Sequence, residues 1–107
     1  GKNLQDHPIV PLKAYCNGDL GYQKSAQGMG ALKAGMRYVV TKDGPAAGSG
    51  IETVSYWDPD DLQAEPTIQC YHVPIISEDG LSPTGTRSGI TFELVVNRPE
   101  IRGGYLV

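Results

Sequence analysis

The clearest pattern along the chain is an alternation with a period of two over residues 89–97, where one set of positions is apolar and the other holds Thr91, Glu93, Val95 and Asn97. Apolar side chains stand at every second position, at Ile90, Phe92, Leu94 and Val96. This period of two is typical of a half-buried strand. Residues 51–57 and 67–73 are rich in β-branched and aromatic side chains and predict two more strands. Residues 8–15 contain two prolines, which favour an edge strand or a crossing connection.

One stretch has helical spacing, over residues 28–42. Its apolar positions recur three or four residues apart, at Met29, Leu32, Met36 and Val39. Three glycines within it each lower helix propensity by nearly 1 kcal/mol relative to alanine. We therefore expect this helix to need packing against another element. Gly44 and Pro45 supply the expected stop signal.

The remaining segments read as turns and loops. Residues 58–61 predict an acidic turn, and residues 77–88 predict a long exposed loop. Residues 20–27 are polar and give no clear pattern, and a short strand is expected after Gly103 and Gly104. One helix and four or five strands without βαβ alternation predict an α+β fold. We expect a single domain over residues 1–107, an antiparallel sheet with the helix packed on one face.

Charge and apolar content exclude several classes of protein. The net charge of −3 is mild, and charges of both signs are interspersed. Nucleic-acid binding is therefore not expected, since it requires a basic patch or stripe. No apolar run approaches the roughly 18 residues that span a bilayer, so this segment is not expected to enter a membrane.

The two cysteines, Cys16 and Cys70, are too few for a disulfide framework. We expect both to be free thiols that pack as small apolar residues, with a single bridge between them as the alternative. Together with His7 and His72 they are the residue types that bind zinc. Their spacing includes no C-x-x-C or H-x-x-x-H pair, so a zinc site is disfavoured.

Several segments resemble one enzyme family in the same order along the chain. The opening string GKNLQDHP, residues 1–8, is similar to the N-L-x-D-H segment of the glucose-methanol-choline oxidoreductases. Residues 44–47 resemble that family's G-P-L-A turn, and residues 52–57 its E-A-G-A-F strand. Residues 66–74 resemble the segment that runs from P-D-I-Q to H-F-V-P. Residues 98–103 resemble R-P-x-S-R-G.

Two positions depart from these family motifs. Thr67 and Ile101 stand where the family usually has Asp and Ser. Gly28-Met29-Gly30 is followed by Ala31-Leu32-Lys33, so the third glycine of a flavin phosphate loop, G-x-G-x-x-G, is missing. The resemblance further implies that the catalytic His, and its His or Asn partner, lie beyond Val107. Neither the flavin loop nor a catalytic residue is therefore expected on this chain.

The resemblance implies an internal piece of a large FAD-dependent enzyme. Residues 1–8 would be the tail of the connection from the flavin domain, and the rest a substrate-binding domain of an FAD-linked reductase-like fold. Asn3 and His7 would lie near FAD. Asp6 is expected to satisfy nearby backbone groups in a turn.

Substrate contacts are expected from the sheet, at Tyr56, Gln69 and Tyr71. A tyrosine there supplies an apolar wall and a hydroxyl donor suited to an alcohol. Ordinary packing is the alternative for each tyrosine, and for Trp57 at the rim. Glu93 is expected on the solvated side, with an inward charge facing a cationic substrate as the alternative. Structural ion pairs are expected for Arg98 and Arg102.

The function implied is oxidation of a primary or secondary alcohol to a carbonyl by hydride transfer to flavin, in a dehydrogenase or oxidase of the choline dehydrogenase type. The expected partners are a small alcohol and the remainder of the flavoenzyme, with the cytoplasm as the default location. A relative of the family's hydroxynitrile lyase, and a stand-alone binding module, are the alternatives. Alone, the chain is expected to expose an apolar sheet face and to associate.

Overall fold

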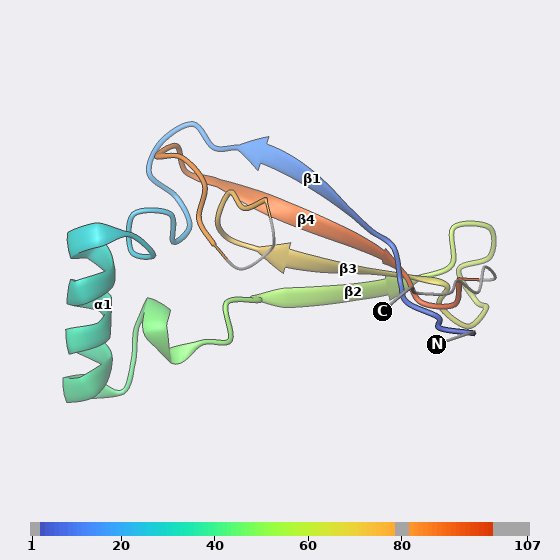
Figure 1. Ribbon diagram of the computed structural model, residues 1–107, viewed down its shortest axis with the longest axis horizontal. Coiled ribbons are helices and arrows are strands. Elements are labelled where there is room, and N and C mark those ends of the chain that lie inside the picture. The colour runs from blue at the N-terminus through green and yellow to red at the C-terminus, as the bar shows by residue number, and fades with distance from the viewer. Residues whose placement is uncertain (1–2, 79–81, 100–107) are drawn as a thin grey trace.

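Four antiparallel strands form one sheet in the computed structural model, which describes residues 3–78 and 82–99 (Figure 1). The strands are β1 (Ile9–Tyr15), β2 (Thr53–Trp57), β3 (Ile68–Val73) and β4 (Gly89–Val96), in the spatial order β1-β4-β3-β2. All four predicted strands are present, and each boundary lies within two residues of its predicted position. The proline-containing β1 is an edge strand, as expected. With the single helix α1 (Gly28–Thr41), the sheet confirms an α+β fold.

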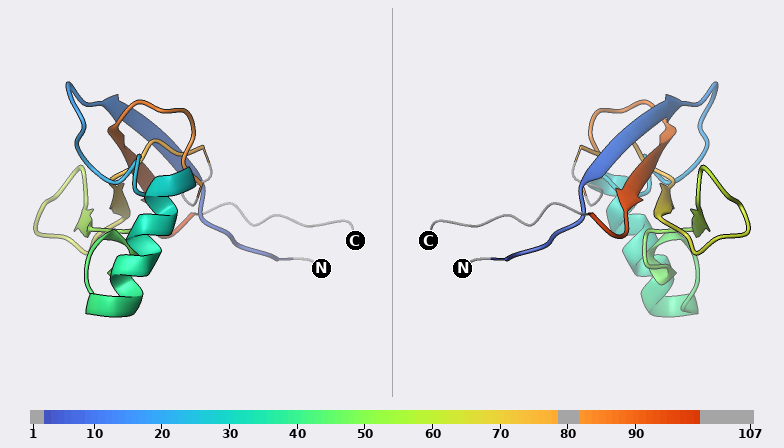
Figure 2. Two further views of the ribbon diagram at one scale, coloured as in Figure 1. Left: turned by 90° about the vertical axis from the view of Figure 1, so that its left-hand side faces the viewer. Right: turned by 90° about the vertical axis from the view of Figure 1, so that its right-hand side faces the viewer.

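The helix spans almost the predicted residues, but its predicted position on a face of the sheet is wrong. It stands beyond the end of the sheet where β1 and β3 finish (Figures 1 and 2). Among the helices and strands of the described ranges it contacts the 3-10 turn η1 (Pro45–Ala47) and no strand. None of its residues is buried, and Met29, Met36 and Val39 are 67%, 61% and 69% exposed. The packing that the glycine-rich helix was expected to need is not supplied by this sheet.

The reason for this position lies in the segment between β1 and the helix. The Tyr22 backbone N–H donates to the Pro74 carbonyl at 2.8 Å. This bond fixes the segment to the loop that leaves β3 at the end of the sheet. Because the helix follows within six residues, it begins beyond the strands and not over them.

A small core lies at the same end of the sheet, under the loop that follows β3. Its apolar members are buried, among them Val73, Ile75 and Ile76, whereas the buried Val95 lies toward the other end of β4, opposite Gln69. Thr91, on β4, is 0% exposed; its Oγ1 donates to the Ile75 carbonyl at 2.8 Å and accepts from the Ser77 N–H at 3.1 Å. The loop therefore covers Thr91 at this end of β4. The apolar series that identified the strand is only half-buried on the other side.

Residues 77–88 were predicted to form an exposed loop, and the prediction of exposure is wrong at both ends of this segment. Ser77 and Ser88 are buried, and Ser77 forms an isolated bridge with Pro83. The buried side chain of Gln23 holds this loop down: its Nε2 donates to the carbonyls of Thr84 and Gly85 at 3.0 and 2.9 Å. Its Oε1 accepts from the Ile76 N–H at 2.7 Å. Backbone groups of the loop are thus satisfied inside the fold.

Some expectations concern residues beyond those described. The short strand after Gly104, the role of Arg102 and the last residues of the R-P-x-S-R-G match lie outside residues 3–78 and 82–99. In the described part, α1 is too short to cross a membrane.

Candidate functional site

The three predicted substrate residues lie together on one face of the sheet. In the β2–β3 pairing, Tyr56 is directly opposite Gln69. Tyr71 is two residues further along β3 and therefore points to the same side. The Gln69 Nε2 donates to the Tyr71 hydroxyl at 2.7 Å. We call the surface formed by Tyr56, Gln69, Tyr71 and Glu93 the tyrosine face.

Glu93 joins this face through the β3–β4 pairing. It is directly opposite Tyr71, with Pro11 of β1 on its other side. Its side chain is half-buried and not on a fully solvated surface, which differs from the favoured expectation. Within residues 3–78 and 82–99 its carboxylate has no hydrogen bond or ion pair. The charge of Glu93 also acts on Cys70 of the neighbouring strand β3. Burial is the larger cause and this charge the smaller one, and both raise the pKa of the Cys70 thiol.

Asn3 and His7, the predicted flavin contacts, are exposed in the segment that leads into β1. Asn3 has a left-handed backbone with φ of 64°. His7 donates its backbone N–H to the Asp6 carboxylate at 2.9 Å, the turn role expected for Asp6. This segment leaves the sheet at the end where Ile9 of β1 shares a cross-strand row with Gln69 and Tyr56. No described hydrogen bond joins Asn3 or His7 to the tyrosine face.

The opposite face of the sheet carries a histidine held by two hydroxyls. The His72 ring lies 2.7 Å through Nδ1 from Thr53 Oγ1 and 3.2 Å through Nε2 from Ser55 Oγ. It packs edge-on against the Phe92 ring, with centroids 5.2 Å apart. Both ring nitrogens thus have hydroxyl partners, and the arrangement contributes to sheet packing between β2, β3 and β4.

The cysteines and histidines do not converge. Cys16 and Cys70 are free thiols, half-buried and buried respectively. Across the described ranges no three His, Cys, Asp or Glu side chains are grouped closely enough to hold a metal ion.

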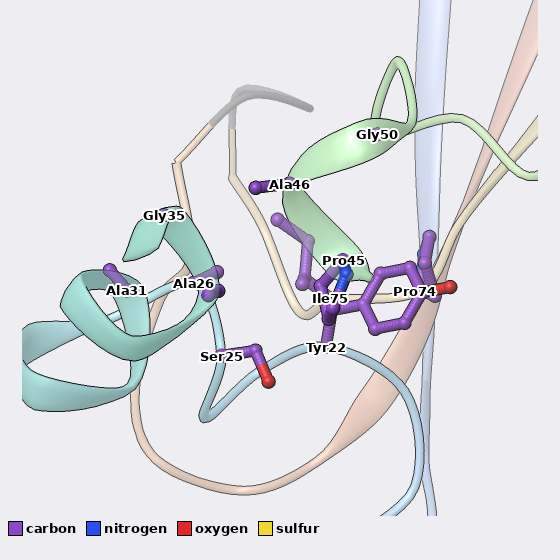
Figure 3. Close-up of a pocket in the computed structure, with 11 residues that line it drawn as sticks. Tyr22, Ser25, Ala26, Ala31, Gly35, Pro45, Ala46, Gly50, Pro74 and Ile75 are labelled. Atoms are coloured by element: carbon purple, nitrogen blue, oxygen red, sulfur yellow. The ribbon is translucent and has the colours of Figure 1, made fainter. Parts of the chain in front are cut away.

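A cavity that the sequence did not indicate lies between the helix and the end of the sheet (Figure 3). Its volume is about 300 Å³, and small or apolar residues from α1, η1 and the two neighbouring loops form most of its wall. Tyr22 is its one aromatic residue. The Tyr22 phenol is hydrogen-bonded to Glu52, and this bond raises the pKa of the phenol. Residues 20–27 have no periodicity, so no local signal marked Tyr22 or Gln23 in advance.

Two further sequence expectations concern Arg98 and the glycines at the start of α1. Arg98 forms the expected ion pair, with its Nη2 2.8 Å from Glu65 Oε2. The glycines at 28 and 30 belong to the first turn of α1, and a Cβ on Gly30 would lie 1.9 Å from the Lys24 carbonyl oxygen.

Comparison with protein families adds no assignment: no family model matches this chain.

Proposed function

We propose that this chain is the substrate-binding part of an FAD-dependent alcohol oxidoreductase, with the tyrosine face as the roof of the substrate pocket. The observation that carries the proposal is the convergence of Tyr56, Gln69 and Tyr71. These residues were selected from family-like motifs, and they occupy two adjacent strands on one side of one sheet.

The hydrogen bond between Gln69 and Tyr71 fixes which group on this face donates and which accepts. The Tyr71 oxygen accepts from the Gln69 amide, so its own proton is free to be donated. A hydroxyl donor held in one orientation suits the oxygen of an alcohol or of its carbonyl product. Tyr56, which is 57% exposed opposite Gln69, adds an apolar wall.

The surface of the chain supports a role within a larger protein. Its accessible surface is 7796 Å², against about 5,800 Å² for a compact monomer of this mass. The radius of gyration is 17.1 Å, against about 13 Å for a compact domain of this length. Tyr56, on the edge strand β2, is 57% exposed, so a pocket beside it requires a second wall. A flavin domain of the parent enzyme would supply that wall.

A bound flavin supplies the hydride acceptor in such an enzyme. Asn3 and His7 fit a position beside it because both side chains are exposed and polar. Their segment also leaves the sheet at the end where Gln69 and Tyr56 lie. The chain residues orient the alcohol and exclude water, while the catalytic base comes from the remainder of the enzyme.

The test is the absorption spectrum and intact mass of the purified natural protein, followed by anaerobic addition of alcohols. We expect a mass several times 11.5 kDa, flavin bands in the visible range, and bleaching of those bands by an alcohol. A protein without flavin would overturn the proposal and favour a binding module. Bound flavin that no alcohol bleaches, together with cleavage of a cyanohydrin, would favour the lyase.

Tyr71→Phe tests the roof itself. Removal of the hydroxyl leaves the ring and takes away the donor that remains when the Tyr71 oxygen accepts from Gln69. We expect kcat/KM for the alcohol to fall by about tenfold to one-hundredfold, as for one lost hydrogen bond to the reacting oxygen. Tyr38→Phe, on the exposed helix, is the matched control and should leave kcat/KM unchanged. Equal effects of the two substitutions would remove Tyr71 from the site.

A further inference from the structure

The cavity of about 300 Å³ between α1 and the end of the sheet has walls that are fixed to the fold (Figure 3). The segment before α1 is bound to the loop after β3, because the Tyr22 N–H donates to the Pro74 carbonyl at 2.8 Å. The segment after η1 is bound to β3, where the Glu52 N–H donates to the His72 carbonyl at 3.1 Å. The fold itself therefore forms the cavity, as is usual for ligand pockets.

The C-terminal end of α1 is held to the turn that precedes η1. The Arg37 side chain lies against Gly44, where a Cβ would come within 3.1 Å of the arginine Cδ and Nε. The Arg37 guanidinium also bonds to the Asp43 carboxylate at 2.8 and 3.0 Å. Within the described ranges α1 contacts no strand. The helix is thus held beside the sheet at its two ends, and the cavity lies under its middle.

Small side chains keep this space open. The helix presents Ala31, Ala34 and Gly35 to the cavity, and η1 presents Ala46. A Cβ on Gly35 would meet no atom within 4 Å. Protein interiors normally fill such space with side chains, because a gap forfeits dispersion contacts on both of its walls. Fixed walls with small side chains therefore suit an occupant that is not one of these side chains.

The chemistry of the wall limits what this occupant can be. None of the described residues that line the cavity carries a charge, so an ion would lose hydration without gaining a partner. Tyr22 supplies an aromatic ring, and its hydrogen bond to Glu52 holds that ring in place. Ser25 is half-buried in the wall, and its hydroxyl can bond to one polar group. An apolar cavity of about 150 Å³ already binds benzene, so a substituted ring has room here.

We propose that this cavity is a second binding site, lined by no residue of the tyrosine face, for a small uncharged aromatic molecule with one polar substituent. The ring of the ligand lies between Tyr22 and the alanines of α1, and its substituent bonds to Ser25. The ligand joins the helix to the end of the sheet, where no strand contact does so. Binding therefore stabilises the position of α1. This inference depends neither on flavin nor on alcohol oxidation.

The test uses two probes of one shape, benzamide and benzoate, titrated calorimetrically into the full natural protein. We expect benzamide to bind with a Kd of about 1 mM or tighter, which is within reach of a ligand of this size. Benzoate should bind at least about tenfold more weakly, because the cavity offers its charge no partner. Absence of benzamide binding, or equal binding of the two probes, overturns the inference.

Two substitutions locate the site from different walls. Ala34→Leu and Ala46→Leu each place a larger side chain in the cavity and should weaken benzamide binding by at least about tenfold. Ala64→Leu makes the same change at an exposed position between β2 and β3 and should leave the binding unchanged. Circular dichroism identifies the folded variants. Binding that survives in a folded variant of either wall overturns the inference.

Hydrogen exchange reports on α1 without any substitution. At about ten times its Kd, benzamide should slow exchange by about tenfold at those amides of residues 28–41 that open when the helix leaves the sheet end. Exchange in the turn at residues 58–61, away from the cavity, should not change. Unchanged exchange throughout α1 in the presence of bound benzamide overturns the inference, and neither result bears on the oxidoreductase proposal.

Discussion

At the scale of single residues, the side chain of Gln23 fixes the loop after β3 through hydrogen bonds to its backbone. It is 1% exposed and joins three backbone groups that belong to the loop after β3. The loop in turn covers Thr91 on β4. Buried backbone groups need hydrogen-bond partners. The Gln23 side chain supplies partners that a helix or a strand would otherwise provide.

Gln23→Leu is expected to destabilise the protein by about 2–4 kcal/mol, since it removes the partner of the buried Ile76 N–H and a donor to the carbonyls of Thr84 and Gly85, of which Gly85 keeps its bond from Gln27. The measurement is the urea midpoint of unfolding. Gln27→Leu is the matched control: its amide also donates to Gly85, but from an exposed position, so about 0.5 kcal/mol or less is expected. Similar losses in both variants would contradict a special role for Gln23.

At the scale of elements, the helix and the turns are held by local contacts more than by the sheet. The helix ends at Lys42, which has a left-handed backbone with φ of 56° and donates its N–H to the Tyr38 carbonyl at 2.9 Å. Arg37 reaches past this end to Asp43 through two bonds of 2.8 and 3.0 Å. The acidic turn after β2 is held by Asp58, which accepts from the N–H groups of Asp60 and Asp61. These bonds explain why local patterns located the helix and this turn well.

Two glycines of α1 offer a sharp test of helix packing. Gly35 has an ordinary helical backbone, and a Cβ there would meet nothing within 4 Å. We expect Gly35→Ala to stabilise the protein by about 0.5–1 kcal/mol through helix propensity. Gly30→Ala should instead destabilise it by about 1–3 kcal/mol, because the new Cβ would overlap the backbone carbonyl of Lys24. Circular dichroism at 222 nm during urea unfolding measures both, and the same sign for both variants would contradict the described packing at Gly30.

Acid should weaken these turns, and the sign follows from the direction of the pKa shifts. The Arg37 guanidinium, and then the Thr41 hydroxyl, hold the pKa of Asp43 below its usual range. The Thr67 hydroxyl, and then two backbone N–H groups, lower the pKa of Asp58. A pKa lower in the folded state gives stability that is complete above the unfolded value of about 3.9 and is lost as pH falls through the folded value.

We therefore expect Asp58→Asn to cost stability at pH 6 and to cost progressively less below about pH 4. Urea midpoints at several pH values measure the difference. Asp60→Asn, in the same turn, is the control substitution. A cost for Asp58→Asn that does not change with pH would show that its charge plays no part.

At the scale of the whole molecule, the chain leaves two apolar surfaces uncovered. One is the face of the sheet opposite the tyrosine face, where Val10 and Leu12 are 56% and 53% exposed. The other is the outer side of α1, where Met36 and Val39 are exposed. Contiguous apolar surface of this kind marks a contact with other protein surface. It is consistent with a place inside the larger enzyme proposed above.

We expect the isolated 107-residue chain to elute as a species heavier than 11.5 kDa and to enhance the fluorescence of an apolar dye. Leu12→Lys and Met36→Lys change one surface each, at exposed positions where folding should be little affected. Each should lower dye binding, and Lys33→Gln, a polar change on the same helix, should not. A clean monomer without dye binding would contradict this expectation.

The sequence by itself determined the four strands, the helix, the acidic turn and the grouping of Gln69 with Tyr71. These features depend on neighbours within a few residues, where backbone sterics and the period of apolar positions decide the outcome. Only the tertiary structure decided that β4 lies between β1 and β3, which brings Glu93 opposite Tyr71. It also decided that the helix stands off the sheet and that Gln23 is buried. Such features depend on pairings between residues far apart in the chain, and competing long-range contacts leave no local periodicity from which they can be read.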